Sequence, residues 1–178
     1  PTAGTKSTGG LSGNNVTIRI YCRNTFTDEI HIFDNVTVAE PAQLYSRSSD
    51  DWDDTLTWSK TQGGISCGCT PTSSDMVNIV DGYTVNMNVS GSAYGINLDN
   101  GTLLWTGSNT LDIYQGNVTI GASGSMDRNG QNAILQFAEN NSINQLVNDG
   151  TFDLYNLTLN NENGDLTISG SQDIDLSN

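Results

Sequence analysis

Three cysteines are the residues whose type and spacing most directly suggest chemistry. Cys67 and Cys69 are separated only by Gly68, and Cys22 lies far upstream. Thiolates bind zinc, but a closed tetrahedral site needs four ligands, and the one histidine, His31, would have to complete it. We therefore favour a disulfide, which an oxidising compartment would maintain. Cys22 could pair with Cys67 or with Cys69, which would leave one thiol over, and a bridge within the Cys-x-Cys pair is a third, more strained alternative.

A second group with chemical potential is the acidic segment from residue 50 to residue 54. Calcium is bound by several carboxylate and carbonyl oxygens, and extracellular calcium is abundant enough to fill weak sites. We predict no cofactor and a solvated acidic loop, with calcium held by Asp50, Asp51, Asp53 and Asp54 as the alternative. Trp52, between these carboxylates, either packs in a core or stacks on the face of a sugar.

The residues of an enzyme are harder to find. A β-helical polysaccharide hydrolase or lyase would use paired carboxylates, or a basic residue beside a metal-bound uronate. Asp51 with Asp53 and Asp173 with Asp175 are such pairs on one face of a strand, but an Asp-rich chain produces them by chance. After residue 60 the chain holds a single Lys or Arg, and with one histidine it offers no Ser/His/Asp set. We predict a non-catalytic protein, with a fragment of a carbohydrate-active enzyme as the alternative.

The overall charge limits the class of partner. Six Lys and Arg stand against 20 Asp and Glu, a formal net charge of −14, so the chain would repel the phosphate backbone of a nucleic acid. No apolar run approaches the roughly 20 residues that span a bilayer, so we do not expect a membrane-embedded protein. Asn, Gly, Ser and Thr together account for 79 of the 178 residues, which is not the composition of a helical enzyme.

The elements that must position these residues are short strands. Apolar side chains occupy every second position in residues 16–21 and 84–89, and Gly, Asn, Asp or Ser follow at the turns. The same pattern recurs at 111–113, 118–120, 152–154, 157–159, 166–168 and 174–176. No window of 11 or more residues shows helical spacing, so the protein is predicted to be all-β.

The spacing of these strands favours a solenoid over a sandwich. Hairpins usually join strands of five or six residues, whereas here apolar-x-apolar strands of three residues lie between polar corners. A turn glycine stands just before such a strand at Gly82, Gly101, Gly116, Gly150 and Gly164, at irregular intervals. We predict a parallel β-helix with about 20–25 residues per coil, and a β-sandwich is the alternative.

Two segments also resemble a known family. Residues 57–85 contain Trp58, Gly63-Gly64, Cys67-Gly68-Cys69, Pro71, Asp75, Val77-x-Ile79 and Gly82-x-Thr-Val85. This order is similar to the opening of the β-helical region in large secreted surface proteins of gliding bacteria. Residues 152–168, with their Asn-Leu-Thr-Leu-Asn-Asn core, resemble the coils of the same proteins. Together the two segments place residues 57–178 in the parallel β-helix. Residues 1–56 are left as an irregular, β-rich N-terminal cap or as the first irregular coils.

The resemblance implies a location and a role. It implies export by the type IX secretion route to the bacterial cell surface, and a role as an adhesin or gliding-surface component. The implied partners are the secretion machinery during export, and glycans or other surfaces afterwards. That family carries a C-terminal sorting domain, and nothing after Leu166 looks like one, so we expect the native chain to continue. Asp54-Thr55-Leu56 matches the O-glycan acceptor pattern of such exported proteins, which makes Thr55 a candidate glycosylation site.

Overall fold

The computed structural model describes residues 40–139, 143–160 and 164–176, and these residues form strands and turns without a helix. The compact unit extends from Pro41 to Asn178. The strand predictions at 16–21, 30–33 and 36–38, together with Cys22 and His31, lie outside the described residues. No helix that could cross a bilayer occurs in the described part of the chain.

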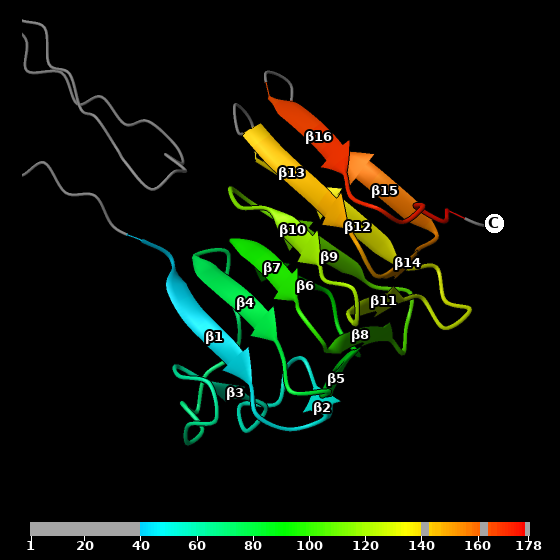
Figure 1. Cartoon of the computed structure of the whole chain (residues 1–178). Helices are drawn as coiled ribbons and strands as arrows, with labels where there is room; N and C mark the ends of the chain where they lie inside the picture. The colour runs from blue at the N-terminus through cyan, green and yellow to red at the C-terminus, as the bar shows by residue number, and fades with distance from the viewer. Residues whose placement is uncertain (1–39, 140–142, 161–163, 177–178) are drawn as a thin grey trace, which may run out of the picture. The chain divides into compact units, whose positions relative to one another are not determined.

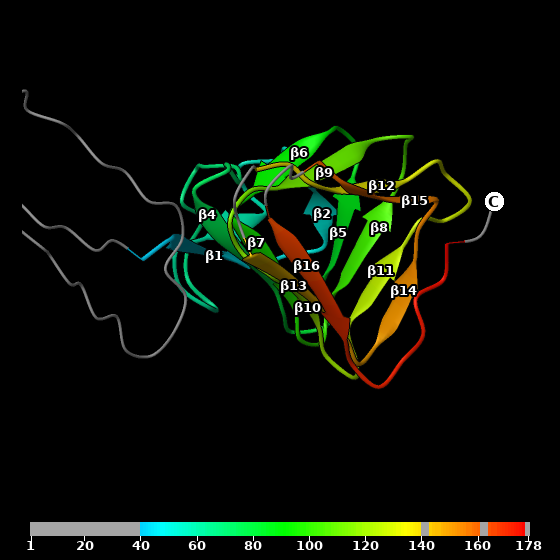
Figure 2. The same cartoon turned by 90° about the horizontal axis from the view of Figure 1, so that it is seen from above.

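Three sheets form the faces of this unit (Figures 1 and 2). Sheet A contains, in spatial order, β16 (Asp165–Ser169), β13 (Ile143–Asn148), β10 (Val118–Ile120), β7 (Gly95–Leu98), β4 (Asp75–Ile79), β1 (Ala42–Ser46) and β3 (Trp58–Ser59). Sheet B contains β14 (Thr151–Asp153), β11 (Ser125–Asp127), β8 (Thr102–Trp105), β5 (Thr84–Met87) and β2 (Asp50–Asp51). Sheet C contains β15 (Asn156–Leu159), β12 (Ile134–Phe137), β9 (Thr110–Ile113) and β6 (Gly91–Ala93).

From β4 onward consecutive strands belong to different sheets, so the chain winds from A to B to C and then returns to A. Within each sheet, neighbouring strands from successive coils pair in parallel, and among the described strands β1 with β3 is the one antiparallel pair. In sheet A the register aligns Val77 with Ile96, Ile96 with Val118, and Val118 with Leu146, which are 19, 22 and 28 residues apart. The protein is therefore a parallel β-solenoid with four complete coils from β4 to β15, as predicted, and the sandwich alternative is wrong.

The core consists of columns of like residues. Alternation turns every second side chain inward, and parallel pairing in register then places each inward side chain on its counterpart in the next coil. In sheet B the column Val85, Leu103, Met126 and Phe152 is at most 2% exposed. Burial decreases in the last coil, where Leu159 is 46% exposed and Ile168 is 52% exposed.

The first coil is incomplete. Sheets A and B begin in it, with β1 and β2, but sheet C begins one coil later, with β6. Because β1 and β2 pair in parallel with β4 and β5, residues 42–51 belong to the solenoid, and the compact unit that contains them begins at Pro41.

Two tryptophans close this end of the core. Trp52 and Trp58 are 2% and 0% exposed, and their rings meet edge to face with centroids 5.3 Å apart. Trp58 Nε1 donates a hydrogen bond of 2.9 Å to the Trp52 carbonyl, which satisfies the indole N–H away from water. Trp52 is thus a packing residue, which confirms the first of the two alternatives, and a ring that is 2% exposed does not present its face to a sugar.

Candidate functional site

The missing sheet C strand of the first coil leaves a hollow on the surface. Its volume is about 400 Å³, and we call it the sheet C hollow. It is lined by Trp52, Asp53, Thr70, Pro71, Val89, Ser90, Gly91, Ser92, Asp112 and Tyr114. Its floor is the edge strand β6 with the adjacent part of β9, and its walls are the turn after β2 and the segment before β4.

Asp112 is the most unusual side chain in this hollow. It points outward from β9, and the register places it between Ser92 of β6 and Gln136 of β12. Its Oδ1 is buried and has no hydrogen-bond partner among the described residues. Burial raises the pKa of the Asp112 carboxyl above its ordinary value, because the charged form loses hydration. The Asp112 carboxyl can therefore accept a hydrogen bond from a ligand hydroxyl, or donate one when it is protonated.

Asp53 is the second carboxylate of the sheet C hollow. It lies in the turn after β2 and is exposed, and its Oδ1 accepts a hydrogen bond of 2.7 Å from Asn88 Nδ2 in the next coil. The hydroxyls of Ser90, Ser92 and Thr70 and the ring of Tyr114 complete the lining. Carboxylates, hydroxyls and one aromatic ring suit a polyhydroxylated ligand, because such a ligand presents many hydrogen-bond donors together with apolar C–H faces.

The shape of the hollow depends on Gly91. A Cβ at this position would lie 2.5 Å from Trp52 Nε1 and 2.8 Å from Cε2, because the Trp52 ring packs directly over the Gly91 backbone. Any larger residue would displace the buried ring. The packing of Trp52 and the width of the hollow are therefore set by the same contact.

The acidic segment with the alternative calcium site is used for coil-to-coil contacts. Asp51 Oδ1 accepts a hydrogen bond of 3.1 Å from Asn86 Nδ2, as Asp53 does from Asn88. Asp50 and Asp54 each accept a hydrogen bond from a backbone N–H nearby. Among the described residues, no three His, Cys, Asp or Glu side chains form a group that could hold a metal. Calcium binding stays an alternative, and melting in calcium and in chelator tests it.

Sheet B presents a different polar surface. One outward column contains hydroxyls, from Thr84, Thr102, Ser125 and Thr151. The adjacent column ends in three stacked carboxylates, Asp127, Asp153 and Asp175, in successive coils. The second enzyme-like pair, Asp173 with Asp175, thus lies at the end of this surface and away from the residues that line the sheet C hollow.

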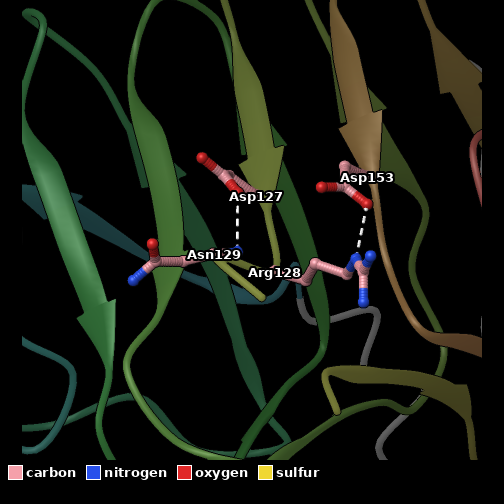
Figure 3. A network of polar contacts seen from close by, with 4 residues as sticks. All are labelled: Asp127, Arg128, Asn129 and Asp153. Carbon is pink, nitrogen blue, oxygen red and sulfur yellow. Dashed lines mark hydrogen bonds and ion pairs between the residues drawn. The ribbon is translucent and has the colours of Figure 1, made fainter. Parts of the chain in front are cut away.

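Arg128 forms an ion pair with the middle carboxylate of this column. Its Nε lies 3.0 Å from Asp153 Oδ1, while Asp127 Oδ1 accepts a hydrogen bond of 2.7 Å from the Asn129 N–H (Figure 3). Asn129 has a φ of 48° and Gly130 a φ of 72°, so this bond closes a tight turn after β11. The Asp127–Gly130 segment is a structural turn stabilised by one cation.

The cysteine pair forms a disulfide. Cys67 and Cys69 are bridged across Gly68, with their Cα atoms 5.2 Å apart. A bridge over so short a loop restricts the unfolded chain by about 1.6 kcal/mol, against about 3 kcal/mol for a 15-residue loop. The bridge therefore adds little to the stability of the fold.

Thr55, the predicted glycosylation site, is exposed in the turn before β3.

Sequence reasoning missed Asp112 and Tyr114. Their outward orientation follows from the alternation in residues 110–114, but nothing in that alternation indicates that Asp112 loses water to its neighbours.

The fold and the hollow define a class of protein, a parallel β-solenoid with a polar surface hollow at its first coil. Comparison with protein families, with curated proteins and with solved structures finds no match for this chain.

Proposed function

We propose that this chain is a non-catalytic, extracellular β-solenoid module of a large cell-surface adhesin, and that it contacts glycans through the sheet C hollow. The observation that carries the proposal is the hollow itself, in which the buried acceptor of Asp112, the carboxylate of Asp53 and the ring of Tyr114 line one space of about 400 Å³. A solenoid supplies a rigid support for such a site, because the coils from β4 onward are held to one another along three sheets.

The negative charge of the chain favours a neutral ligand over an acidic one. With a net charge of −14 and two carboxylates in the hollow, the site would repel an acidic polysaccharide. We therefore expect neutral sugars or amino sugars to bind, with hydroxyls or an ammonium group donating to Asp112.

The test is a glycan-array screen of the whole chain, followed by calorimetry with the best neutral glycan. Tyr114→Ala is expected to weaken binding by about fivefold or more, since a stacking contact contributes about 1–3 kcal/mol in comparable sites. Tyr155→Ala is the matched control, because Tyr155 is 39% exposed and belongs to the last coil. If no glycan binds, or if both variants bind equally well, the hollow is not a glycan site and the module acts as a stiff spacer.

Export by the type IX route is part of this proposal and rests on the resemblance of residues 57–85 and 152–168 to gliding-bacterial surface proteins. In the producing cell, the chain should be accessible to added protease at the surface. This accessibility should disappear when type IX secretion is blocked, and a chain that stays protected in both cases would refute surface export.

A second candidate function is that of a β-helical carbohydrate-active enzyme. One observation favours it, since Asp112 has a pKa raised by burial and shares the hollow with a second carboxylate, Asp53. Two carboxyl groups in one space can act as general acid and general base in glycoside hydrolysis. Incubation with the bound glycan distinguishes the candidates. New reducing ends that disappear in Asp112→Asn would establish the enzyme, and binding without cleavage would support the module.

A further inference from the structure

The Cys67–Cys69 disulfide is built on the core yet contributes little to it. It lies in residues 60–74, which connect β3 to β4 and contain no strand. The Cys67 N–H donates a hydrogen bond of 3.0 Å to the carbonyl of Trp58, which is fully buried. The bridge is thus fixed to the first coil of the solenoid. Because it closes a loop of one intervening residue, it contributes little to stability.

Both half-cystines line open hollows. Cys67 shares a space of about 280 Å³ with Ser59, Lys60, Thr61, Ile65 and Ser66. Cys69 lines a second space of about 390 Å³, which also includes Lys60 and Asp75. At Gly68, where φ is +63°, no atom lies within 4 Å of the position that a Cβ would occupy. Both cysteines are half-buried against the core, so the two hollows are the routes by which we expect a thiol to reach the bridge.

Two side chains that line the same hollow as Cys67 would favour its reaction with a thiol of another polypeptide. Lys60 lines both hollows, and an ammonium group nearby attracts an incoming thiolate and stabilises the thiolate that leaves. Ile65 is 88% exposed in the same hollow as Cys67, where it offers an apolar contact to an unfolded chain. No carboxylate lines the Cys67 hollow, whereas Asp75 lines that of Cys69. Attack is therefore directed to Cys67.

We propose that Cys67-Gly68-Cys69 is a thiol–disulfide exchange site that oxidises a pair of thiols in another polypeptide. A substrate thiolate attacks Cys67 Sγ, the Cys67–Cys69 bond breaks, and the electron pair goes to Cys69 Sγ, which leaves as a thiolate. The second substrate thiolate then attacks the substrate sulfur of the mixed disulfide and releases Cys67 Sγ as a thiolate. Two electrons pass to the bridge, the substrate gains one disulfide, and a low-molecular-weight disulfide restores the site by the reverse exchange.

The equilibrium test uses the full chain with Cys22→Ser, so that the bridge contains its only two cysteines. The protein is equilibrated in buffers of reduced and oxidised glutathione, its thiols are trapped, and its mass is measured. We expect half-reduction at a value of [GSH]²/[GSSG] at least about 100-fold lower than structural disulfides require. A bridge that resists reduction as those disulfides do would overturn the proposal.

The kinetic test separates a reactive site from a merely exposed bridge. Lys60→Gln is expected to slow reduction by glutathione by about 3- to 10-fold at low salt, with a smaller effect at high salt. Ile65→Ser should slow the reaction with an apolar dithiol peptide but not with glutathione, and Ile143→Ser, which changes an isoleucine that is 71% exposed elsewhere, should slow neither. Circular dichroism of each variant confirms the fold. Equal rates for the parent and both hollow variants would refute the assigned roles of Lys60 and Ile65 and leave the bridge as an ordinary loop closure.

Discussion

Asn148 offers a direct test of how successive coils hold one another. This asparagine ends β13 and is fully buried, although the register places it on Ile120 in an otherwise apolar column. Its Nδ2 donates a hydrogen bond of 2.7 Å to the Asp173 carbonyl, and its Oδ1 accepts one of 3.2 Å from the Gly150 N–H. One side chain therefore ties the segment after β16 and the turn before β14 to the core.

The expected cost of Asn148→Ala follows from these two bonds. Each contributes about 1 kcal/mol net, and a buried partner left without a hydrogen bond costs a further 1–3 kcal/mol. Asp173 is exposed, so water can satisfy its carbonyl, whereas Gly150 is only half-exposed. We therefore expect a loss of about 2–3 kcal/mol, which equals roughly a 30- to 140-fold increase in the open population.

This loss should be local, because a solenoid coil contacts only its neighbours. Native-state hydrogen exchange is the assay. Amides of β13, β14 and β16 should lose protection by the factor given above, while those of β4 and β5 keep theirs. The exposed Asn156, replaced by alanine, is the control and should change protection by less than about twofold. A uniform loss over all coils, or unchanged protection in β13–β16, would refute the reasoning that buried amides act as local ties.

Three further predictions concern the polar surfaces. Because the pKa of Asp112 is raised in the folded state, the folded protein binds a proton before the unfolded chain does, so stability should fall as pH rises from the ordinary carboxyl pKa through the raised one. Asp112→Asn should remove this pH dependence, as followed by urea unfolding across pH. Gly91→Val should destabilise the protein by about 1–3 kcal/mol and alter tryptophan fluorescence, because its side chain would collide with Trp52, and an unchanged unfolding midpoint would contradict that contact. Arg128→Gln should cost about 1 kcal/mol or less at low salt and less at high salt, and a loss that does not depend on salt would argue against its pairing with Asp153.

The fold could be predicted because its signal is local. Period-two alternation in short segments specifies inward and outward side chains without knowledge of the partner strand. The structure also explains why the glycine repeat looked irregular. Gly101 and Gly150 precede sheet B strands, whereas Gly116 and Gly164 precede sheet A strands. The glycines therefore mark two different corners of the coil, and the distances between them in the sequence are unequal.

The site could not be predicted because it arises from pairing across coils. The hollow exists because sheet C begins one coil after sheets A and B, and no local pattern specifies where a sheet begins. Residues 42–51 pair with strands about 35 positions later. This distance is longer than the 20–25 residues expected of one coil, so the pairing is not visible as a sequence repeat. The desolvation of Asp112 likewise comes from packing around it, not from the sequence beside it.

The direction of the interstrand hydrogen bonds has a mechanical consequence. In each sheet these bonds connect one coil to the next, so a force that pulls successive coils apart acts along the bonds and loads one coil boundary at a time. A coil of 22 residues, such as that from Ile96 to Val118, extends to roughly 75 Å when straightened, whereas coils are stacked about 4.8 Å apart. A chain serving as a surface spacer would therefore lengthen under load in steps of roughly 70 Å and absorb work at every step while the remaining coils stay folded.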